Sequence, residues 1–480
     1  MRGSMTLAVL RSVGLAWFVA AVVVAGPVAA QTAPPAGAGL SPQAEAALRT
    51  LRYHREDEDW RWLKRGARTP DAWDRFEYIP LGNGASLSIG ADLRAYYEGF
   101  RNENFGVGLA ENRYFQNRAL VHANLRINDN LRIFTQLQSE GVTNRKGGPR
   151  RTIDRNDLDV NQAFVETAVP GGVLRLGRQE LRLGVGRILS TRDGVLNVRQ
   201  PLDGARLILR NKAGRLDAFV FHQVLTTPDA FDDRSKGQPY WWGVQAQRAQ
   251  PTPRDLGVEL YLLGYDAQRA TYYDGGVGQE RRRTLGGRVF INRDGWDSDA
   301  EANYQFGTFR GNRIEAWSAD WEAGYTFRDR PWKPRLGWAF TANSGDKAIG
   351  DGELNSFRPF VARHPWGQLA PFGLTNIEGV QAVANLQPRS NLRLTARRYW
   401  VRRQQDAEGI YAGGYAPLRP GSPAQSRDIG SQTELAAEYD VTRHLKLSLF
   451  LTHVEAGRYI RQGPGGKDID YTAAILQYRF

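Results

Sequence analysis

The feature of this sequence that most constrains its fold is a two-residue alternation of apolar and polar side chains, which begins near Ala85 and recurs to the C-terminus. Leu87 and Ile89 alternate with polar neighbours, and the pattern returns at residues 118–127 and 445–452. Successive side chains of a strand point to opposite faces, so each segment is predicted to be a strand with one apolar face. A soluble sandwich would not normally carry Arg, Gln and Asn on the second face of so many strands.

The connections between these strands alternate in length. Short turns occur at residues 128–130, 170–172, 211–214, 292–295, 388–391 and 442–444. Long polar connections occur at residues 99–113, 141–156, 184–202, 225–239, 268–281, 344–375, 402–430 and 457–470. Outer-membrane barrels have short periplasmic turns and long external loops. The sequence therefore predicts an all-β fold, a transmembrane outer-membrane β-barrel of about 18 antiparallel strands.

Composition excludes several other classes. A mean hydropathy of -0.50 with 24% charged residues cannot supply repeated apolar helices of about 20 residues. The 13 Trp, 19 Tyr and 20 Phe are far more than a disordered chain carries. Because the chain has no Cys, disulfides, thiolate nucleophiles and Cys-ligated metal sites are excluded.

The N-terminal part predicts export. Residues 1–30 combine Arg2 and Arg11 with an apolar stretch and small residues before Gln31, which is the layout of a signal peptide. An uncleaved membrane anchor is the alternative. Residues 31–84 are predicted to be an N-terminal periplasmic segment, partly helical, with a pore plug or partner-docking segment as the alternative. The barrel is expected to occupy residues 85–480.

The C-terminal residues are consistent with a barrel strand. Residues 471–480 alternate and end on Phe480, and a terminal Phe on an amphipathic strand resembles the signal that the outer-membrane barrel assembly machinery reads. Trp and Tyr lie near predicted strand ends, as an interfacial girdle requires. We therefore expect a bacterial outer-membrane location, with outer-membrane lipid and the assembly machinery as partners and periplasmic export proteins as further ones.

Function should reside on the inward face, because a barrel of this size encloses an aqueous channel. Of 64 basic residues 56 are Arg, whose planar guanidinium group can donate two parallel hydrogen bonds to a carboxylate. The alternatives are codon bias for the Arg excess and cross-strand salt bridges for single residues. With the apolar face outward, the predicted substrate-binding residues of the lumen are Arg94, Arg118, Arg126, Arg132, Arg175, Arg206, Arg288, Arg393 and Arg397.

Residues 174–181, with the sequence Leu-Arg-Leu-Gly-Arg-Gln-Glu-Leu, resemble the Gly-Arg-Gln segment of the alginate export family of outer-membrane porins. Residues 197–206, 343–346, 374–377 and 428–430 are similar to later parts of the same family. The resemblance implies an 18-stranded barrel whose Arg-rich lumen conducts an anionic uronate polysaccharide. Gln162 is neutral, whereas an alginate exporter of this family has a basic residue at the corresponding position. Residues 31–84 have no counterpart in the family.

Arg178 belongs to the Gly-Arg-Gln segment and is added to the predicted lumen residues. Strict alternation from Leu174 and Leu176 would point its side chain outward, at a cost of about 2 to 4 kcal/mol near the membrane midplane. We predict that a bulge at Gly177 turns Arg178 inward; the alternative is that Arg178 lies at the upper rim.

The predicted function is export of an anionic, alginate-like polysaccharide through an anion-selective, arginine-rich porin. The alternative is a general or nutrient-uptake porin for small anionic solutes. The six His are too scattered for a metal site, so we expect no enzyme activity, catalytic residue, metal or other cofactor. Nucleic acid is not an expected partner, because the basic residues alternate into a lumen. At least one long loop is expected to constrict the mouth.

Overall fold

The computed structural model describes residues 50–67, 70–150, 152–192, 196–273, 276–361, 367–413 and 416–480. The predicted signal peptide, residues 1–30, lies outside the described residues. Among the described residues, no helix is long and apolar enough to cross a membrane.

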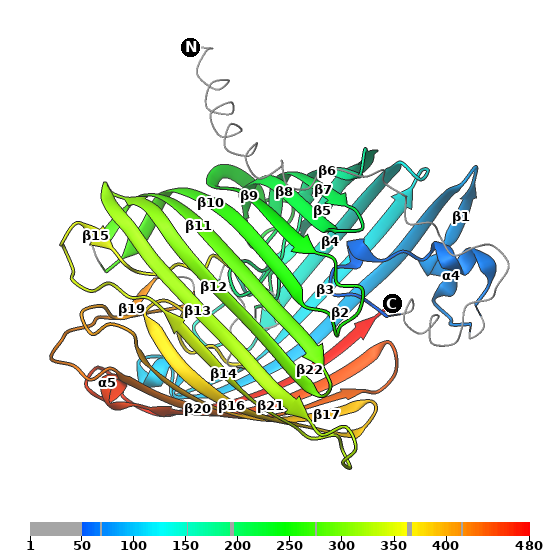
Figure 1. Cartoon of the computed structure of the whole chain (residues 1–480). Helices are drawn as coiled ribbons and strands as arrows, with labels where there is room; N and C mark the ends of the chain where they lie inside the picture. The colour runs from blue at the N-terminus through cyan, green and yellow to red at the C-terminus, as the bar shows by residue number, and fades with distance from the viewer. Residues whose placement is uncertain are drawn as a thin grey trace, which may run out of the picture.

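Eighteen antiparallel strands form the wall of a closed barrel (Figure 1), which confirms the predicted fold class. Each wall strand pairs with the next one along the chain, and β2 pairs with β22 to close the wall. The wall strands are β2 Ala85–Arg101, β3 Glu111–Arg126, β4 Leu131–Thr143, β5 Asn156–Val169, β6 Gly172–Gln179, β7 Leu202–Arg210, β8 Gly214–Leu225, β9 Arg234–Arg248, β10 Gly257–Tyr272, β11 Gly276–Arg293, β12 Trp296–Phe309, β13 Asn312–Thr326, β14 Arg335–Asn343, β16 Ile377–Arg389, β17 Leu392–Arg403, β20 Asp428–Asp440, β21 Leu445–Ala456 and β22 Ile469–Arg479.

The remaining elements are short. In the described part of the chain, three small helices precede the barrel, and β1 pairs with the start of β2. The other short elements lie in the long connections, where β18 and β19 form a separate two-stranded sheet. Their bounds are η1 Arg55–Asp57, η2 Arg61–Arg65, α4 Asp74–Glu77, β1 Ile79–Gly82, η3 Glu103–Gly106, β15 Glu353–Leu354, β18 Ile410–Tyr411, β19 Pro417–Arg419 and α5 Arg458–Arg461.

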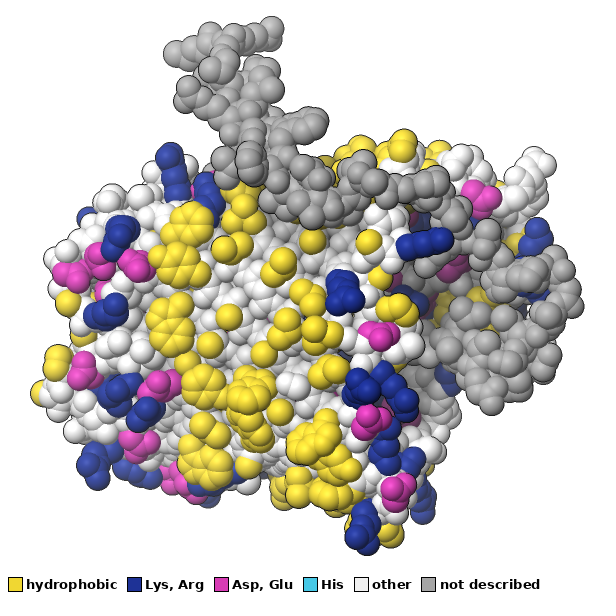
Figure 2. Space-filling view, viewed as in Figure 1, with side chains coloured by type: hydrophobic (Ala, Val, Ile, Leu, Met, Phe, Trp, Pro, Cys, Tyr) yellow, Lys and Arg dark blue, Asp and Glu magenta, His cyan; other side chains and the backbone are white. Residues whose placement is uncertain are grey.

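The two faces of the wall differ as the alternation predicts. Leu93 of β2 and Leu451 of β21 are exposed on the outside, whereas Arg94 and Thr452, one residue further on, are buried. Figure 2 shows the result, a band of apolar side chains around the middle of the visible surface with charged side chains toward both ends. Such a band matches the apolar core of a bilayer.

The two ends of the barrel are different (Figure 1). One end carries most of the tight turns, the C-terminus and α4, and is called the short-turn end here. The other end carries the long connections with β15, β19 and α5, and is called the long-loop end. In outer-membrane barrels these ends face the periplasm and the exterior, respectively.

Two long connections fold into the barrel and pack there. Leu181 and Leu189 of the connection after β6 are buried against wall residues such as Trp241, and Phe357 and Phe360 of the connection after β14 join the same apolar cluster. Inward folding of a long loop, as expected, is seen in both connections, and constriction of the mouth stays a prediction. The long-loop half of the lumen is therefore partly a packed core.

Candidate functional site

Four of the predicted lumen arginines lie in one row across β3 to β7, near the short-turn end. Arg126 is directly opposite Arg132, and Arg175 is directly opposite Arg206. Glu166 of β5 lies between the two pairs, opposite both Arg132 and Arg175. We call the four arginines the basic row. Their side chains are at most 19% exposed, so they face the inside of the barrel.

Carboxylates compensate part of this charge. Glu166 accepts hydrogen bonds from Arg132 at 2.9 Å and from Arg175 at 2.8 Å. Arg206 forms an ion pair with Asp217 at 2.7 Å. Buried charges need such partners, because an unpaired charge away from water is strongly unfavourable. The four guanidinium groups of the row thus share two wall carboxylates, Glu166 and Asp217.

Arg94 and Arg118 form a second pair of directly opposite arginines, on β2 and β3. Both bind the connection after β6, because Arg94 donates to the side-chain oxygen of Asn197 at 3.0 Å and Arg118 to its carbonyl at 3.4 Å. The Asn197 amide donates to the carbonyls of Asn117, Gly141 and Asp154. These two arginines therefore hold an inward-folded loop.

The remaining predicted arginines lie on other parts of the wall. Arg288 pairs with Glu259 at 2.9 Å and also with Asp299. Arg397 pairs with Glu434, which is fully buried. Arg393 is exposed near the short-turn end, opposite Glu438 in the strand register.

The prediction that a bulge at Gly177 turns Arg178 into the lumen is wrong. The register of β6 with β5 and β7 is unbroken through Gly177. Arg178 lies beside the end of β6, where it donates to Asp203 of β7 at 2.8 Å and to the Val160 carbonyl of β5 at 3.1 Å. Because β5 extends beyond β6, the guanidinium group bridges the gap that the short strand leaves in the rim.

The N-terminal segment contains residues that sequence reasoning did not select. Residues 53–60 lie inside the barrel, and Arg55, Glu56, Glu58 and Trp60 are all buried. Arg55 donates to the Ala91 carbonyl at 3.0 Å. The sequence signal that could have indicated this position is the run of four acidic residues, 56–59, in a basic chain.

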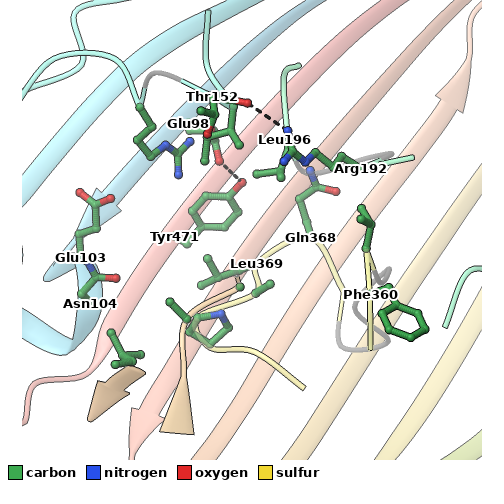
Figure 3. A pocket seen from close by; sticks show the side chains of 18 of the residues that line it. Glu98, Glu103, Asn104, Thr152, Arg192, Leu196, Phe360, Gln368, Leu369 and Tyr471 are labelled. Carbon is green, nitrogen blue, oxygen red and sulfur yellow. Dashed lines mark hydrogen bonds between the residues drawn. The ribbon is translucent and has the colours of Figure 1, made fainter. Parts of the chain in front are cut away.

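A cavity of about 690 Å³ lies at the long-loop end (Figure 3). It is lined by the arginines Arg150, Arg192 and Arg358 together with aromatic side chains that include Trp241 and Tyr265. Arg192 donates to the Thr152 carbonyl at 3.0 Å. In the described part of the chain, no carboxylate lies within ion-pair distance of Arg192. Its guanidinium group lines the cavity, with the Thr152 carbonyl as its hydrogen-bond acceptor.

A second cavity, of about 210 Å³, lies between the N-terminal segment and the wall. His54, Glu56 and Asp57 line one side, and Arg206 and Arg215 belong to the facing wall strands. Both cavities are bordered by the connection after β6, and their described linings share no residue. This connection separates the two spaces.

Within the described residues, one group of carboxylates is close enough to hold a cation. Ligand atoms of Asp159, Asp232 and Asp233 lie within 4.8 Å of one another. Asp233 accepts hydrogen bonds from Gln138 and Asn156, and its backbone amide donates to Asp159. The cluster therefore belongs to the hydrogen bonding of the rim.

Comparison with solved structures identifies outer-membrane proteins of the same fold. Acinetobacter baumannii OccAB4 has a TM-score of 0.57 at 11% identity, over 83% of this chain and 98% of that one. The Pseudomonas aeruginosa outer-membrane protein OpdK has a TM-score of 0.55 at 10% identity, over 82% and 98% of the chains. Its structure with vanillate gives 0.54 at 11% identity and the same coverage. At these identities the likeness concerns the fold alone.

A comparison with curated proteins finds no match in sequence. A family model described as alginate export matches residues 85–473, which is nearly the whole barrel. The family and the fold are those of channels, and both indicate the bacterial outer membrane. The chain therefore belongs to the alginate export family, as an outer-membrane β-barrel channel.

Proposed function

We propose that this channel exports an anionic polysaccharide of the uronate class from the periplasm to the exterior. The observation that carries the proposal is the basic row, four guanidinium groups at adjacent register positions with one carboxylate between them. The row lies at the short-turn end, where a polymer from the periplasm enters. The alginate export family supports a substrate of this class.

The chemistry of the row suits a polyuronate. A guanidinium group binds a carboxylate through two parallel hydrogen bonds, which an ammonium group cannot do. Conduction also requires that no single site holds the polymer too firmly. Glu166 and Asp217 already share these guanidinium groups, so a passing carboxylate exchanges one partner for another. Several modest contacts then share the binding.

The cavity at the long-loop end supplies a second kind of contact. Arg192 offers a cation for a carboxylate, and Trp241 and Tyr265 offer aromatic surface for the apolar faces of sugar rings. An uncharged sugar would use only the aromatic part. A uronate uses both.

The partners of the channel follow from the same proposal. Outer-membrane lipid contacts the apolar band, and periplasmic export proteins deliver the polymer to the short-turn end. Phe480 serves as the signal for the barrel assembly machinery before folding. In the folded chain its ring stacks on Trp73 with centroids 3.7 Å apart, so recognition has to precede this contact.

A second candidate is a porin for small anionic solutes. The structural neighbour OpdK has been solved with vanillate, a small carboxylate. The cavity of about 690 Å³ has the volume of a small-molecule site. In this case the channel would bind monomeric carboxylates as well as oligomers.

Planar-bilayer recording with uronate oligomers tests the proposal. One variant converts the basic row to Lys, which keeps the charge but removes the planar fork, and another converts it to Gln. The Lys set should keep anion preference in a KCl gradient but lose about tenfold in oligomer block, because bidentate contacts are gone. The Gln set should lose both properties.

The control is Arg113→Gln. It removes one positive charge, as each substitution of the Gln set does, but at an exposed position. It should leave oligomer block unchanged. Oligomer block by the Lys set equal to that of the original protein would favour the small-solute porin. A preference for cations at low salt would contradict both candidates.

A further inference from the structure

The part of the N-terminal segment inside the barrel, residues 53–60, is strongly acidic. It contains four acidic residues, Glu56 to Asp59, and one Arg, so its formal charge is -3 with neutral His. The whole chain has a formal charge of +13. An acidic segment inside a basic channel resembles, in charge, the polymer that the channel is proposed to carry.

This segment lies along the basic row. The Glu56 carbonyl accepts a hydrogen bond from Arg132 at 2.6 Å, and a carboxylate oxygen of Asp59 lies 3.9 Å from the Arg126 guanidinium group. The Glu56 carboxylate accepts a hydrogen bond from Gln162 at 3.1 Å. The segment thus occupies positions at which a polyuronate would meet the row.

The segment also contacts the inward-folded connection after β6. The Tyr53 hydroxyl lies 3.0 Å from the Thr191 hydroxyl, and the Arg199 guanidinium group stacks on the Tyr53 ring at 4.2 Å. His54 lies 3.6 Å from Glu180. These contacts span from the wall to the loop, so the segment obstructs the lumen between them.

Most contacts of this segment are polar and exchangeable. It forms a 3₁₀ turn and pairs with no wall strand among the described residues, and Trp60 is its only buried large apolar side chain. By contrast, the chain that follows is fastened to the barrel. The Trp73 ring stacks on Phe480 and its indole NH donates to the Tyr478 hydroxyl at 2.9 Å, while β1 pairs with β2. Release of residues 53–60 would break the hydrogen bonds of Arg55 to the Ala91 and Phe480 carbonyls but would leave the contacts of Trp73 and β1 in place.

We propose that residues 53–60 are a resident plug that imitates the anionic substrate, and that an incoming polyuronate displaces them from the basic row. The polymer and the plug then compete for the same guanidinium groups. That the displacing molecule is a polyuronate rests on the proposed function. Obstruction of the lumen by residues 53–60 does not depend on it.

A reversible tether tests the closure. Because the chain has no Cys, the double variant Glu56→Cys/Gln162→Cys can be joined by a cleavable bis-maleimide. In plain KCl, cleavage of the linker should raise the time-averaged conductance about two- to fivefold, since ion flux follows the open cross-section. The control pair, Arg398→Cys/Glu455→Cys, joins side chains in contact on the outer face and should show no change. Equal conductance before and after cleavage in the Glu56/Gln162 pair would overturn the plug.

Charge removal tests the imitation of substrate. The quadruple variant Glu56→Gln/Asp57→Asn/Glu58→Gln/Asp59→Asn keeps the shape of the plug but not its charge. It should open more often in KCl, and uronate oligomers should enter at concentrations about tenfold lower, because the internal competitor is weakened. The matched control neutralises four exposed acids, Glu111, Asp294, Asp329 and Asp351.

The outcomes separate the two proposals. Conductance that depends on the tether, without any effect of uronate oligomers, would retain the plug and reject the uronate channel. Oligomer entry that is the same for the charged and the neutralised plug would reject competition. Entry that improves only when the plug is released or neutralised supports both.

Discussion

At the scale of single residues, arginine side chains in the lumen share carboxylate partners. Glu166 is the clearest case, since it accepts hydrogen bonds from both Arg132 and Arg175 and its side chain is 12% exposed. Without this carboxylate the two guanidinium groups would repel each other in a confined space. The pair of contacts therefore stabilises the barrel and moderates the charge that a substrate meets.

Glu166→Gln should lower the free energy of unfolding by about 2 to 4 kcal/mol, because it leaves two confined cations without their shared anion. Guanidinium unfolding in detergent, followed by tryptophan fluorescence, measures this change. The control is Glu322→Gln, whose contact with Arg335 is 3.4 Å long and half exposed. An effect no larger than that of the control would contradict the structural role of Glu166.

Another residue-scale effect concerns Glu77 of α4, at the short-turn end. Burial raises the pKa of Glu77 to about 7, and nearby Asp74, Glu58 and Asp71 act in the same direction, against Arg443. The folded chain therefore holds a proton that the unfolded chain has lost between pH 4.5 and about 7. Because the folded state binds more protons there, the stability of this region falls as pH rises through that window.

Hydrogen exchange of residues 73–82 at about pH 5 and about pH 8, corrected for intrinsic rates, measures this dependence. Protection should be greater at the lower pH, and Glu77→Gln should remove most of the difference. Unaltered pH dependence in Glu77→Gln would assign the effect to another group.

At the scale of elements, the connection after β6 controls the space between the two cavities. Asn197 is its main anchor, because its amide donates to three carbonyls of the wall and loops at 3.0 to 3.1 Å. Arg94 and Arg118 add hydrogen bonds to the same part of the loop. Polar contacts thus fix the part of the loop around Asn197, while Leu181 and Leu189 fix another part by apolar packing.

Asn197→Ala should release this anchor and raise the amplitude of open-channel current fluctuations about twofold or more, since four side-chain hydrogen bonds are lost together. Single-channel recording in KCl measures the fluctuations. The control Asn211→Ala lies in a short turn at the other end. If current fluctuations in Asn197→Ala are no larger than in the original protein, other contacts hold the loop.

The elements also show what sequence can and cannot predict. Leu93 and Arg94 were assigned to the correct faces, because lipid and lumen impose a period of two on every wall strand. The predicted bulge that turns Arg178 inward is wrong, whereas the alternative, a position at the rim, agrees with β6 ending before β5. The inward fold of residues 53–60 depends on contacts with distant strands, which no local pattern encodes.

At the scale of the whole molecule, alternation predicts the wall of the barrel and the inward arginines, but not the contacts that fill the interior. The apolar band and the register of the strands follow from alternation. The plug, the inward loops and the shared carboxylates form a filled lumen in which the arginines are mostly engaged. We therefore expect a regulated channel instead of an open anion pore.

Efflux from liposomes tests the central claim most directly. Proteoliposomes are loaded with a fluorescent uronate oligomer or with a neutral oligosaccharide of the same length and label, and the release rates are compared. The account predicts that the uronate oligomer leaves about tenfold faster, because it alone displaces the acidic plug and binds the basic row. Equal rates, or faster release of the neutral oligomer, would contradict it.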